Sequence, residues 1–282
     1  MTKRSLKTSA AAVAAVAALS FSLAACGSSD DDASEPAGST TPTTSATADL
    51  DLVSDGKLTV CSDIPYPPFE KFDKSTPSGV AGFDIDMVQY AADKLGLGLE
   101  VLDEEFDGLQ SGLTLNAGTC DVVASAMTIT DEREKNLDFT QGYYNAAQSL
   151  LVPDDSDIAS IDDLAGKKVG VQKGTTGEDY AEANAPDADI QVLKDDPSLF
   201  LALQAGQIDA ILQDYPVNAE HEAAGGYKVV ETYDTGEHYG LAVKSGNTAL
   251  LDALNDSIDA MKADGTYDTS YEKWFGTKPP AE

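Results

Sequence analysis

The chain has 282 residues, with 49 acidic side chains against 18 basic ones and a formal net charge of −31. Such a charge repels phosphate groups and anionic lipid headgroups, so binding to nucleic acid and adhesion to a membrane by charge are both excluded. Residues 56–276 have an ordinary globular composition and are enough for one large domain or two small ones.

The first 25 residues have the pattern of an export signal. Basic residues at Lys3, Arg4 and Lys7 precede an apolar run over residues 10–19, which is shorter than a membrane-spanning helix. A spanning helix is the alternative interpretation. The stretch LAAC, which ends at Cys26, resembles the bacterial lipobox, whose cysteine becomes the mature N-terminus and carries lipid. We therefore expect a lipoprotein signal peptide over residues 1–25, lipidation of Cys26, and a lipid-anchored protein on the extracytoplasmic side of the cell membrane.

A polar, low-complexity segment follows the cysteine. Residues 27–50 read GSSDDDASEPAGSTTPTTSATADL and show no apolar periodicity. Such a composition buries too little apolar surface to offset the entropy of folding. We therefore expect residues 26–50 to form a disordered tether.

From residue 57 onward, short β-branched runs alternate with helical patterns. The expected strands are Leu58–Cys61, Asp121–Ser125, Lys168–Val171 and Ala210–Gln213. Three apolar stripes at helical spacing end before Gly96, Gly206 and Gly265. Their members are Ile85, Val88, Ala91, Ala92 and Leu95; Leu199, Leu201, Ala202 and Ala205; and Leu250, Leu251, Leu254, Ile258 and Met261. This alternation predicts an α/β fold with parallel sheets and ligands at the carboxyl ends of the strands.

Several chemistries lack their motifs. The sequence contains no HExxH, CxxC or GxSxG, and His221 and His238 each stand alone, so we expect no catalytic residue, no metal and no cofactor. Residues 170–177, GVQKGTTG, follow an expected strand but lack the ending of a phosphate loop. They instead predict a helix that begins near Gly177 and is capped by Thr175 or Thr176, which aims backbone N–H groups at an anion. An ordinary strand-to-helix turn is the alternative.

Five stretches in order along the chain resemble the polar amino-acid family (family 3) of extracellular solute-binding proteins for ABC importers. The resemblance covers residues 57–276 and includes the closing DGTYDTSYEKWFG. The five stretches are CSDIPYPPFE at 61–70, GFDIDMVQYAADKLG at 82–96, ASAMTITDER at 124–133, GVQKGTTGEDY at 170–180 and IDAILQD at 208–214.

The resemblance implies a two-lobe, periplasmic-binding-protein-like (type II) fold, with two crossing strands between the lobes and a ligand cleft between them. The first lobe is expected over residues 51–148 and 241–282, and the second over residues 149–240. The implied function is binding of a polar L-amino acid for an ABC permease in the membrane, with ATP hydrolysed elsewhere and not by this chain. We expect a monomer.

The family's ligand contacts map onto residues of matching chemistry. Arg133 matches the arginine that grips the α-carboxylate, and its guanidinium fork suits bidentate binding. Ser125 and Thr128 match positions that supply hydroxyl and backbone hydrogen bonds. Thr176 is expected to cap the opposing helix and reach the same carboxylate, and Asp214 to receive the α-ammonium. Without the resemblance, Arg133 would be read as a surface residue in the first turn of a helix.

The contacts to the ligand side chain are less defined by the resemblance. Tyr66 and Phe106 match the pair that sandwiches the side chain, and aromatic faces suit an aliphatic stem or a cation. Gln172 matches a position that varies with specificity, and Ala126 stands where some relatives have serine or glycine. Phe69 is expected in the core instead.

Charge gives a further indication about the ligand. Lys173 is the one additional cation near the matched positions, which disfavours an acidic amino acid. Asp63 and Glu70, near the aromatic loop, weakly favour a cationic or amide side chain.

Cys61 and Cys120 leave two interpretations open. An even pair outside the cytoplasm favours a disulfide. In the family's strand order, however, the two residues are staggered by about three to four positions, or roughly 10 Å, which exceeds the Cα separation that a disulfide spans.

Two other classes of function remain. A secreted, dehydratase-like enzyme on the same fold would need an acid or base over the ligand, and Glu178 is the candidate. A ligand-sensing domain would need a membrane-spanning helix beyond the lobes, and we expect none.

Overall fold

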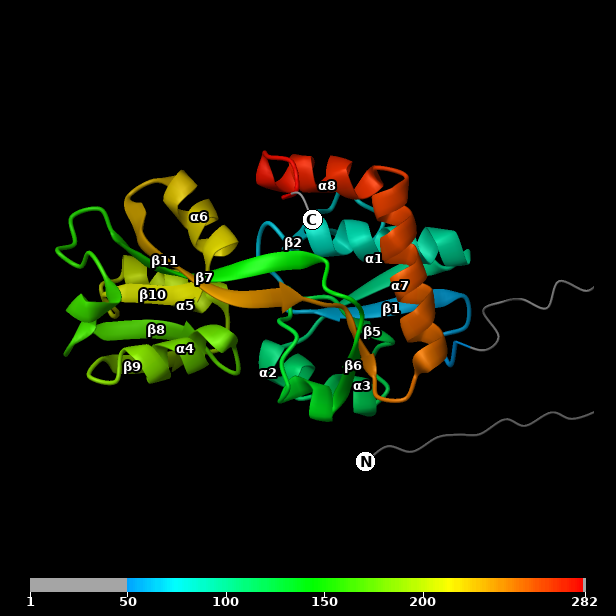
Figure 1. The fold of residues 1–282 in the computed structure, drawn as a ribbon, viewed down its shortest axis with the longest axis horizontal. Coiled ribbons are helices and arrows are strands. Elements are labelled where there is room, and N and C mark those ends of the chain that lie inside the picture. The colour runs from blue at the N-terminus through cyan, green and yellow to red at the C-terminus, as the bar shows by residue number, and fades with distance from the viewer. Residues whose placement is uncertain (1–49, 281–282) are drawn as a thin grey trace, which may run out of the picture. The chain divides into compact units, whose positions relative to one another are not determined.

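The computed structural model describes residues 50–280, in which the strands form two five-stranded mixed sheets and a small hairpin (Figure 1). The predicted signal peptide, Cys26 and most of the predicted tether lie outside the described residues. Leu50, which we placed in the tether, is a correction: it is buried in the first apolar core, and its carbonyl accepts a hydrogen bond from Asn247.

The sheet of the first lobe has the strand order β4-β1-β5-β12-β6. Its strands are β1 Lys57–Ser62, β4 Gly98–Asp103, β5 Val122–Val123, β6 Leu137–Phe139 and β12 Ala242–Lys244. β4 and β5 pair with β1 in parallel, whereas β12 is antiparallel to both β5 and β6. The prediction of purely parallel sheets was therefore wrong at this edge, because β12 enters from the far end of the chain. The hairpin strands β2 Lys71–Phe72 and β3 Val80–Ala81 form a separate small sheet.

The sheet of the second lobe has the order β11-β7-β10-β8-β9. Its strands are β7 Tyr144–Pro153, β8 Lys168–Gln172, β9 Asp189–Leu193, β10 Ala210–Asp214 and β11 Tyr227–Tyr239. β8, β9 and β10 are parallel, as predicted, and β7 and β11 run antiparallel to their neighbours. The two-lobe α/β architecture is thus confirmed.

Two long strands connect the lobes. β7 and β11 pair from Tyr227↔Pro153 to Tyr239↔Tyr144, and Figure 1 shows them side by side, running from the second sheet toward the first. The residues at which one lobe ends and the other begins, 148/149 and 240/241, stay a prediction.

Helices cover both faces of each sheet. In the first lobe, α1 Phe83–Leu95, α7 Thr248–Ala263 and α8 Thr266–Phe275 lie on one side, and the short helices α2 Phe106–Gln110 and α3 Leu113–Asn116 lie on the other (Figure 1). The second lobe carries α4 Thr176–Asn184, α5 Asp196–Gln204 and α6 Tyr215–Ala224. Two 3₁₀ turns lie at Arg133–Lys135 and Ile161–Leu164. Among residues 50–280, no helix is both long and apolar enough to cross a membrane.

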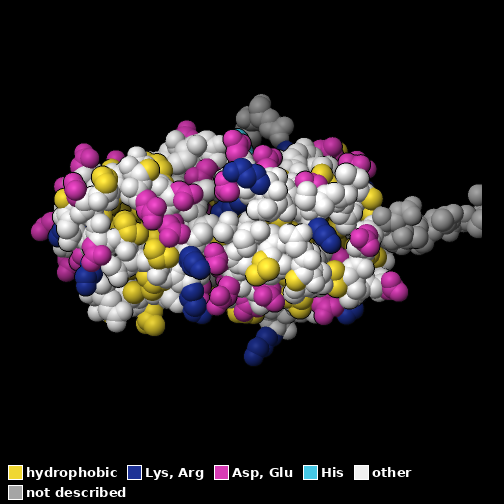
Figure 2. Space-filling model, turned by 90° about the horizontal axis from the view of Figure 1, so that it is seen from below, with side chains coloured by type: hydrophobic (Ala, Val, Ile, Leu, Met, Phe, Trp, Pro, Cys, Tyr) yellow, Lys and Arg dark blue, Asp and Glu magenta, His cyan; other side chains and the backbone are white. Residues whose placement is uncertain are grey.

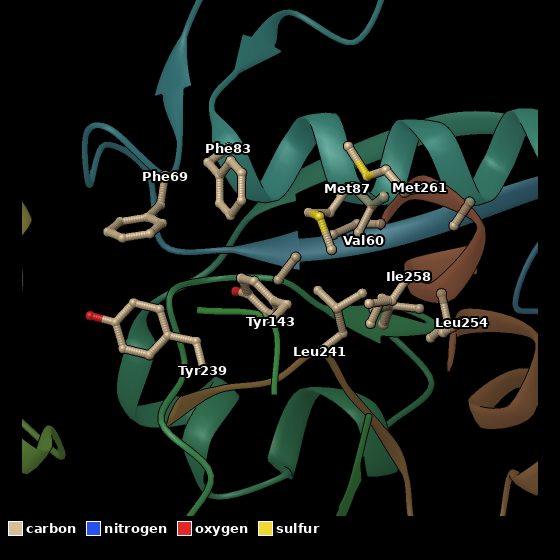
Figure 3. Close-up of a cluster of buried hydrophobic side chains, with 14 of the residues drawn as sticks. Val60, Phe69, Phe83, Met87, Tyr143, Tyr239, Leu241, Leu254, Ile258 and Met261 are labelled. Atoms are coloured by element: carbon tan, nitrogen blue, oxygen red, sulfur yellow. The ribbon is translucent and has the colours of Figure 1, made fainter. Parts of the chain in front are cut away.

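The first lobe has its main core between the sheet and α1, α7 and α8. Figure 3 shows Val60 of β1, Met87 of α1, and Ile258 and Met261 of α7 converging in it. Phe69 is fully buried and meets Tyr144 edge-on, with the ring centroids 5.1 Å apart. The prediction that Phe69 belongs to the core is therefore confirmed.

α1 has clear sequence determinants. Its predicted apolar stripe faces the core, Asp84 and Asp86 lie in its first turn, and Gly96 ends it in the left-handed conformation. Gly82 precedes the helix at a point of close backbone approach, since a Cβ there would lie 1.8 Å from the Phe69 carbonyl oxygen. The glycine therefore lets the loop that ends at Glu70 pack against the start of α1.

The apolar stripe predicted for α5 was partly wrong. Leu199 and Ala202 are buried as expected, but Leu201 is 65 % exposed and Ala205 is exposed, whereas Leu203 is buried. The inward face follows positions i, i+3 and i+4 from Leu199, which is the ordinary helical spacing. Leu201, two positions after Leu199, points to the opposite side of the helix and is therefore exposed.

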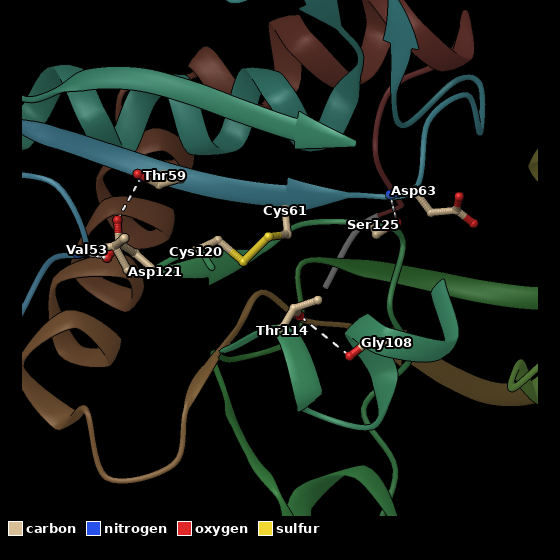
Figure 4. The surroundings of a disulfide bond; sticks show 9 residues. All are labelled: Val53, Thr59, Cys61, Asp63, Gly108, Thr114, Cys120, Asp121 and Ser125. Atoms are coloured by element: carbon tan, nitrogen blue, oxygen red, sulfur yellow. Dashed lines mark hydrogen bonds between the residues drawn. A yellow bond between two sulfur atoms is a disulfide. The ribbon is translucent and has the colours of Figure 1, made fainter. Parts of the chain in front are cut away.

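Cys61 and Cys120 form a disulfide, with their Cα atoms 5.8 Å apart (Figure 4). The stagger argument against a bond was wrong in its premise. The stagger itself is as predicted, because Cys61 pairs with Val123, three positions after Cys120. Its conversion into roughly 10 Å requires an extended chain at Cys120, but β5 begins only at Val122. The Asp121 carboxylate accepts hydrogen bonds from the Val53 and Thr59 amides, and this bend brings Cys120 to Cys61.

Replacing both cysteines, in Cys61→Ala with Cys120→Ala, is expected to lower the free energy of unfolding by about 2–4 kcal/mol, because the crosslink no longer restricts the unfolded chain. Denaturant titration of the oxidised wild type and the double variant measures the difference. A reducing agent should lower the midpoint of the wild type and leave that of the variant unchanged. Equal midpoints for the two oxidised proteins would contradict the expectation.

On the face that Figure 2 shows, the acidic residues are widely spread. Figure 2 shows Asp and Glu side chains scattered across one face, with a few Lys and Arg side chains among them and no single large acidic patch. This distribution fits a solvated acidic surface rather than a dedicated site for a cationic partner.

Candidate functional site

A cavity lies where strands of both sheets end. β1 ends just before Asp63, and β5 leads directly into Ser125; in the second lobe, β8 ends at Gln172 and β10 at Asp214. Because the carboxyl ends of parallel strands meet at one edge of a sheet, each lobe brings its polar residues to one wall of this cavity.

The cavity and its mouth together comprise about 310 Å³ of empty space. All nine residues predicted to contact ligand line it, and two further residues, Asp63 and Thr175, line it as well. The predicted set is Tyr66, Phe106, Ser125, Ala126, Thr128, Arg133, Gln172, Thr176 and Asp214. The structure therefore gathers the predicted residues in one place; the contact that each makes with a ligand stays a prediction.

Arg133 is the cation of the cavity and is only 5 % exposed. Its guanidinium donates to the Thr128 carbonyl of the first lobe at 2.7 Å and to the Gly174 carbonyl of the second lobe at 3.0 Å. It lies over the Phe106 ring, 5.2 Å from the centroid. Burial lowers the pKa of Arg133 to about 10, while Asp214 acts in the opposite direction, so the side chain is charged at neutral pH. The guanidinium is thus held by backbone carbonyls of both lobes in this arrangement.

Two buried acids, Glu70 and Asp84, accept hydrogen bonds from the segment that precedes Arg133. Ser125 Oγ donates to Glu70 at 3.0 Å and accepts from the Asp63 amide, and the Ala126 amide donates to Asp84 at 2.8 Å. Burial raises the pKa of both the Glu70 and Asp84 carboxyls. Glu70, which we had connected with the ligand side chain, is fully buried and does not line the cavity. That interpretation is corrected, because the Glu70 carboxyl supports Ser125 from inside the first lobe.

The start of α4 differs from the prediction. Thr175, not Thr176, is the N-cap: its side chain accepts from the Glu178 amide at 3.1 Å. Thr176 is the first helical residue, and its hydroxyl donates to Glu237 at 2.7 Å. Within residues 50–280, the Thr176 and Gly177 amides have no hydrogen-bond acceptor, so this end of the nine-residue helix presents partial positive charge near the Arg133 side of the cavity.

The Thr128 hydroxyl is also directed to Glu237, at 2.8 Å. A hydroxyl has one hydrogen to donate, so the Thr128 and Thr176 side chains are not donors toward the cavity in this arrangement. The expected contacts from Thr128 and Thr176 to a ligand carboxylate stay a prediction. Their backbone groups and the Arg133 fork remain available to an anion.

Asp214, at the end of β10, lines the cavity from the second lobe and gathers three donors. Its carboxylate accepts from the Tyr66 hydroxyl at 2.9 Å, the Tyr239 hydroxyl at 2.6 Å and the Gln148 amide at 2.6 Å. Burial raises the pKa of Asp214 to about 6, the nearby Glu237 adds to the rise, and the three hydrogen bonds oppose it. Asp214 is thus positioned as an acceptor for a cationic group, with its orientation fixed by both lobes.

Asp63 and Gln172 face one another across the cavity from opposite lobes. Gln172 Nε2 donates to the Asp63 carboxylate at 2.5 Å and to the Lys194 carbonyl at 3.0 Å. Burial raises the pKa of Asp63 to about 7, and the charges of Asp195 and Asp103 add to the rise. Asp63 was noted in the sequence for its charge, and its place after β1 was the signal that it reaches the cavity.

Three residues that the sequence analysis did not single out support the site. Gln148 of β7, together with Glu237 and Tyr239 of β11, reaches the cavity residues from the crossing strands. The sequence signal for them was weak, because crossing strands were expected only from the family resemblance and their register was not predictable.

The residues considered for other chemistry lie elsewhere. Glu178 accepts from the Gly174 amide at 2.6 Å and does not line the cavity. Lys173 pairs on the surface with Asp107 at 2.9 Å. His221 bonds Asp196, and His238 bonds Asn145. Within residues 50–280, no group of three or more His, Cys, Asp or Glu side chains is arranged to hold a metal ion.

Comparisons with known proteins agree on one family. The model of the bacterial extracellular solute-binding proteins, family 3, matches residues 58–277. A probable histidine-binding protein of Neisseria gonorrhoeae is 33 % identical over 271 residues, which is 93 % of this chain and 94 % of the relative. The ABC transporter glutamine-binding protein of Bacillus subtilis (strain 168) is 35 % identical over 265 residues, covering 91 % of this chain and 93 % of the relative.

Solved structures give the same result. The crystallised ancestral arginine-binding protein bound to arginine is 39 % identical and superposes with a TM-score of 0.73, covering 78 % of this chain and 99 % of its own. The matched region includes both lobes and every residue that lines the cavity. The chain therefore belongs to the bacterial extracellular solute-binding proteins of family 3.

Proposed function

We propose that the protein is the substrate-binding component of an ABC importer for a polar L-amino acid, and that its ligand carries a cationic side chain. The observation that carries the proposal is the arrangement of charge in one cavity between the lobes, which Arg133, Asp214 and Asp63 line together. Relatives that bind histidine and glutamine, and a solved relative that holds arginine, support the amino-acid part.

The α-carboxylate and α-ammonium are assigned to opposite partners. The Arg133 fork and the free amides at the start of α4 suit the carboxylate, since both favour an anion in a site shielded from water. Asp214 suits the ammonium, because its bonds to Tyr66, Tyr239 and Gln148 hold both oxygens in place. Because Arg133 belongs to the first lobe and Asp214 to the second, an amino acid contacts both of them only when the two lobes are close together.

The charge balance favours a cationic ligand. The cavity is lined by one arginine against two aspartates, and a ligand with a net charge of +1 balances them when both are ionised, whereas a neutral zwitterion leaves Asp63 without a cationic partner. Tyr66 and Phe106 offer faces for the aliphatic part of such a side chain. An amide side chain is the second candidate, since Asp63 with its raised pKa and Gln172 supply hydrogen bonds to a neutral group.

Binding and closure are linked. Three hydrogen bonds join the first lobe to the second: Tyr66 to Asp214, Gln172 to Asp63, and Arg133 to the Gly174 carbonyl. A ligand that touches both walls adds to these contacts and shifts the population toward the closed form. The permease is proposed to read that form, while this chain itself performs no chemistry and needs no cofactor. Lipid on Cys26 is proposed to keep the protein, as a monomer, at the cell membrane.

A thermal-shift screen of the twenty L-amino acids tests the function. A ligand at about 100 times its dissociation constant stabilises the folded protein by about 2.7 kcal/mol, which raises the melting temperature. With ornithine included as an additional ligand, we expect the largest rise for arginine, lysine or ornithine. Mass spectrometry of the incubated ligands checks for turnover. No rise with any amino acid, or conversion of one of them, would overturn the proposal.

The affinity for a cationic amino acid is expected to fall by roughly tenfold more between pH 8 and pH 6 in the wild type than in Asp63→Asn. Because the pKa of Asp63 in the empty cavity is about 7, a cation must expel a proton at the lower pH. Asp214, with a pKa of about 6, contributes about twofold over the same range in both proteins. Calorimetry at the two pH values measures the change in affinity for each protein. An equal change in the wild type and in Asp63→Asn would show that Asp63 does not contact the cation.

A further inference from the structure

Glu237 takes its place through an irregularity in β11. Tyr233 pairs with Gln148 of β7, but the next pair is Glu237 with Ala146, so β11 has two more residues than β7 between the pairs. Gly236 accommodates the bulge with φ of 69°. Without the bulge, Thr235 would stand opposite Ala146, and the Glu237 side chain would lie farther along the strand.

Four donors surround the Glu237 carboxylate. Oε2 accepts from Thr176 Oγ1 at 2.7 Å and Thr128 Oγ1 at 2.8 Å, and Oε1 accepts from Thr235 Oγ1 at 2.7 Å. Gln148 Nε2 lies 3.4 Å from both oxygens. An ionised carboxylate has two oxygens with about four acceptor positions and no donor, so it matches this environment in a way that a neutral amide does not.

The two threonines that share Oε2 belong to opposite walls. Thr128 follows Ser125 and Ala126 on the first wall, and Thr176 begins α4 on the second. One oxygen accepts from both hydroxyls at these distances only when the walls are as close as they are here. Glu237 does not line the cavity, so the contact leaves room for a ligand.

We propose that Glu237 is a positioning residue: a fixed anion on the crossing strand that fastens Thr128 to Thr176 and so stabilises the closed cleft behind the ligand. The contact is made in the closed arrangement and lost when the walls separate, so it slows opening and release. It also orients Thr128 and Thr176 so that their backbone groups, rather than their hydroxyls, face the ligand carboxylate. This last step rests on the proposed function, whereas the fastening of the walls does not.

The kinetics of ligand release test the proposal. Glu237→Ala is expected to raise koff for the tightest amino acid of the thermal-shift screen about tenfold, with kon nearly unchanged, because hydrogen bonds to a charged group are lost from the closed form. Glu237→Gln keeps one carbonyl acceptor and should recover part of the loss. Stopped-flow measurement of intrinsic fluorescence at fixed pH gives both rates.

Two threonine variants supply the matched comparison. Thr176→Val removes a bond between the walls, whereas Thr235→Val removes a bond to the same carboxylate from within β11. Thr176→Val should raise koff and show little further effect in Glu237→Ala, and Thr235→Val should change koff much less. Equal effects of the two threonine variants, or an unchanged koff in Glu237→Ala, would overturn the proposal.

A measurement without ligand separates this inference from the proposed function. Dyes on cysteines introduced at the exposed positions Glu182 of α4 and Ala249 of α7 report the distance between the lobes by energy transfer. If no amino acid binds the wild type, the proposed function fails, and the ligand-free distance distribution then decides the role of Glu237. A smaller closed fraction in Glu237→Ala supports the fastening, and an identical distribution overturns it.

Discussion

Arg133→Ala is expected to weaken binding of the amino-acid ligand by about 3–5 kcal/mol, or roughly two to four decades in affinity. The substitution leaves the ligand carboxylate buried without its cationic partner. It also removes the bonds to the Thr128 and Gly174 carbonyls, so the closed cleft loses a contact between its walls. Calorimetry with the wild type and the variant measures the loss.

The α-amide of the same amino acid identifies the partner of Arg133. The amide should bind the wild type poorly and lose comparatively little more in Arg133→Ala, since the charge interaction is already absent. The two proteins and two ligands form a cycle that gives the coupling directly. The small residual loss with the amide reports the bond to Gly174 between the walls. Additive losses over the cycle would mean that the guanidinium does not meet the carboxylate.

Asp214→Asn is expected to cost a similar amount, about 3–5 kcal/mol of binding free energy, at the ammonium end. The neutral amide loses the charge attraction, and its NH2 group also meets the donors Tyr66, Tyr239 and Gln148, which now serve a carboxylate. An analogue of the ligand without its α-amino group should lose much less. Titration of both ligands into both proteins makes the comparison.

Asp209→Asn is the matched control for that experiment. Asp209 stands just before β10, is exposed, and accepts from the Lys168 amide at 2.8 Å without lining the cavity. Its replacement should leave the affinity unchanged. An equal loss in the two variants would indicate that β10 had shifted, and a retained affinity in Asp214→Asn would contradict the ammonium assignment.

Local patterns in the sequence predicted the alternation of strands and helices, whereas the two-lobe fold and the cavity residues were predicted from the family resemblance. Strand ends and glycine turns are local features, but Arg133 alone reads as a surface residue and Asp214 as a strand-end acid, and only the resemblance connects them with one site. The apolar stripe of α1 was predicted correctly, because its helical spacing is a local pattern. The stripe predicted for α5 wrongly included Leu201, which lies on the outer side of the helix.

The remaining features depend on tertiary geometry. Glu237 reaches Thr176 through a bulge in β11, and a bulge has no sequence signal strong enough to set the register in advance. The disulfide depends on where β5 begins, which the Asp121 bonds to Val53 and Thr59 decide. Thr175 and Thr176 are equivalent as caps in sequence, and only the hydrogen bond to Glu178 distinguishes them.

The Cys61–Cys120 crosslink bears on how specificity diverges among such proteins. It joins the strand that ends beside Asp63 to the strand that leads to Ser125, so the two ends of the first wall are covalently held at a fixed separation (Figure 4). The second wall has no disulfide in the described part of the chain, and Gln172 is held there by hydrogen bonds alone. We therefore expect substitutions that adapt the cavity to a longer or shorter ligand to be tolerated more easily at Gln172 than in the crosslinked first wall. The second lobe would then be the half of the site in which specificity changes.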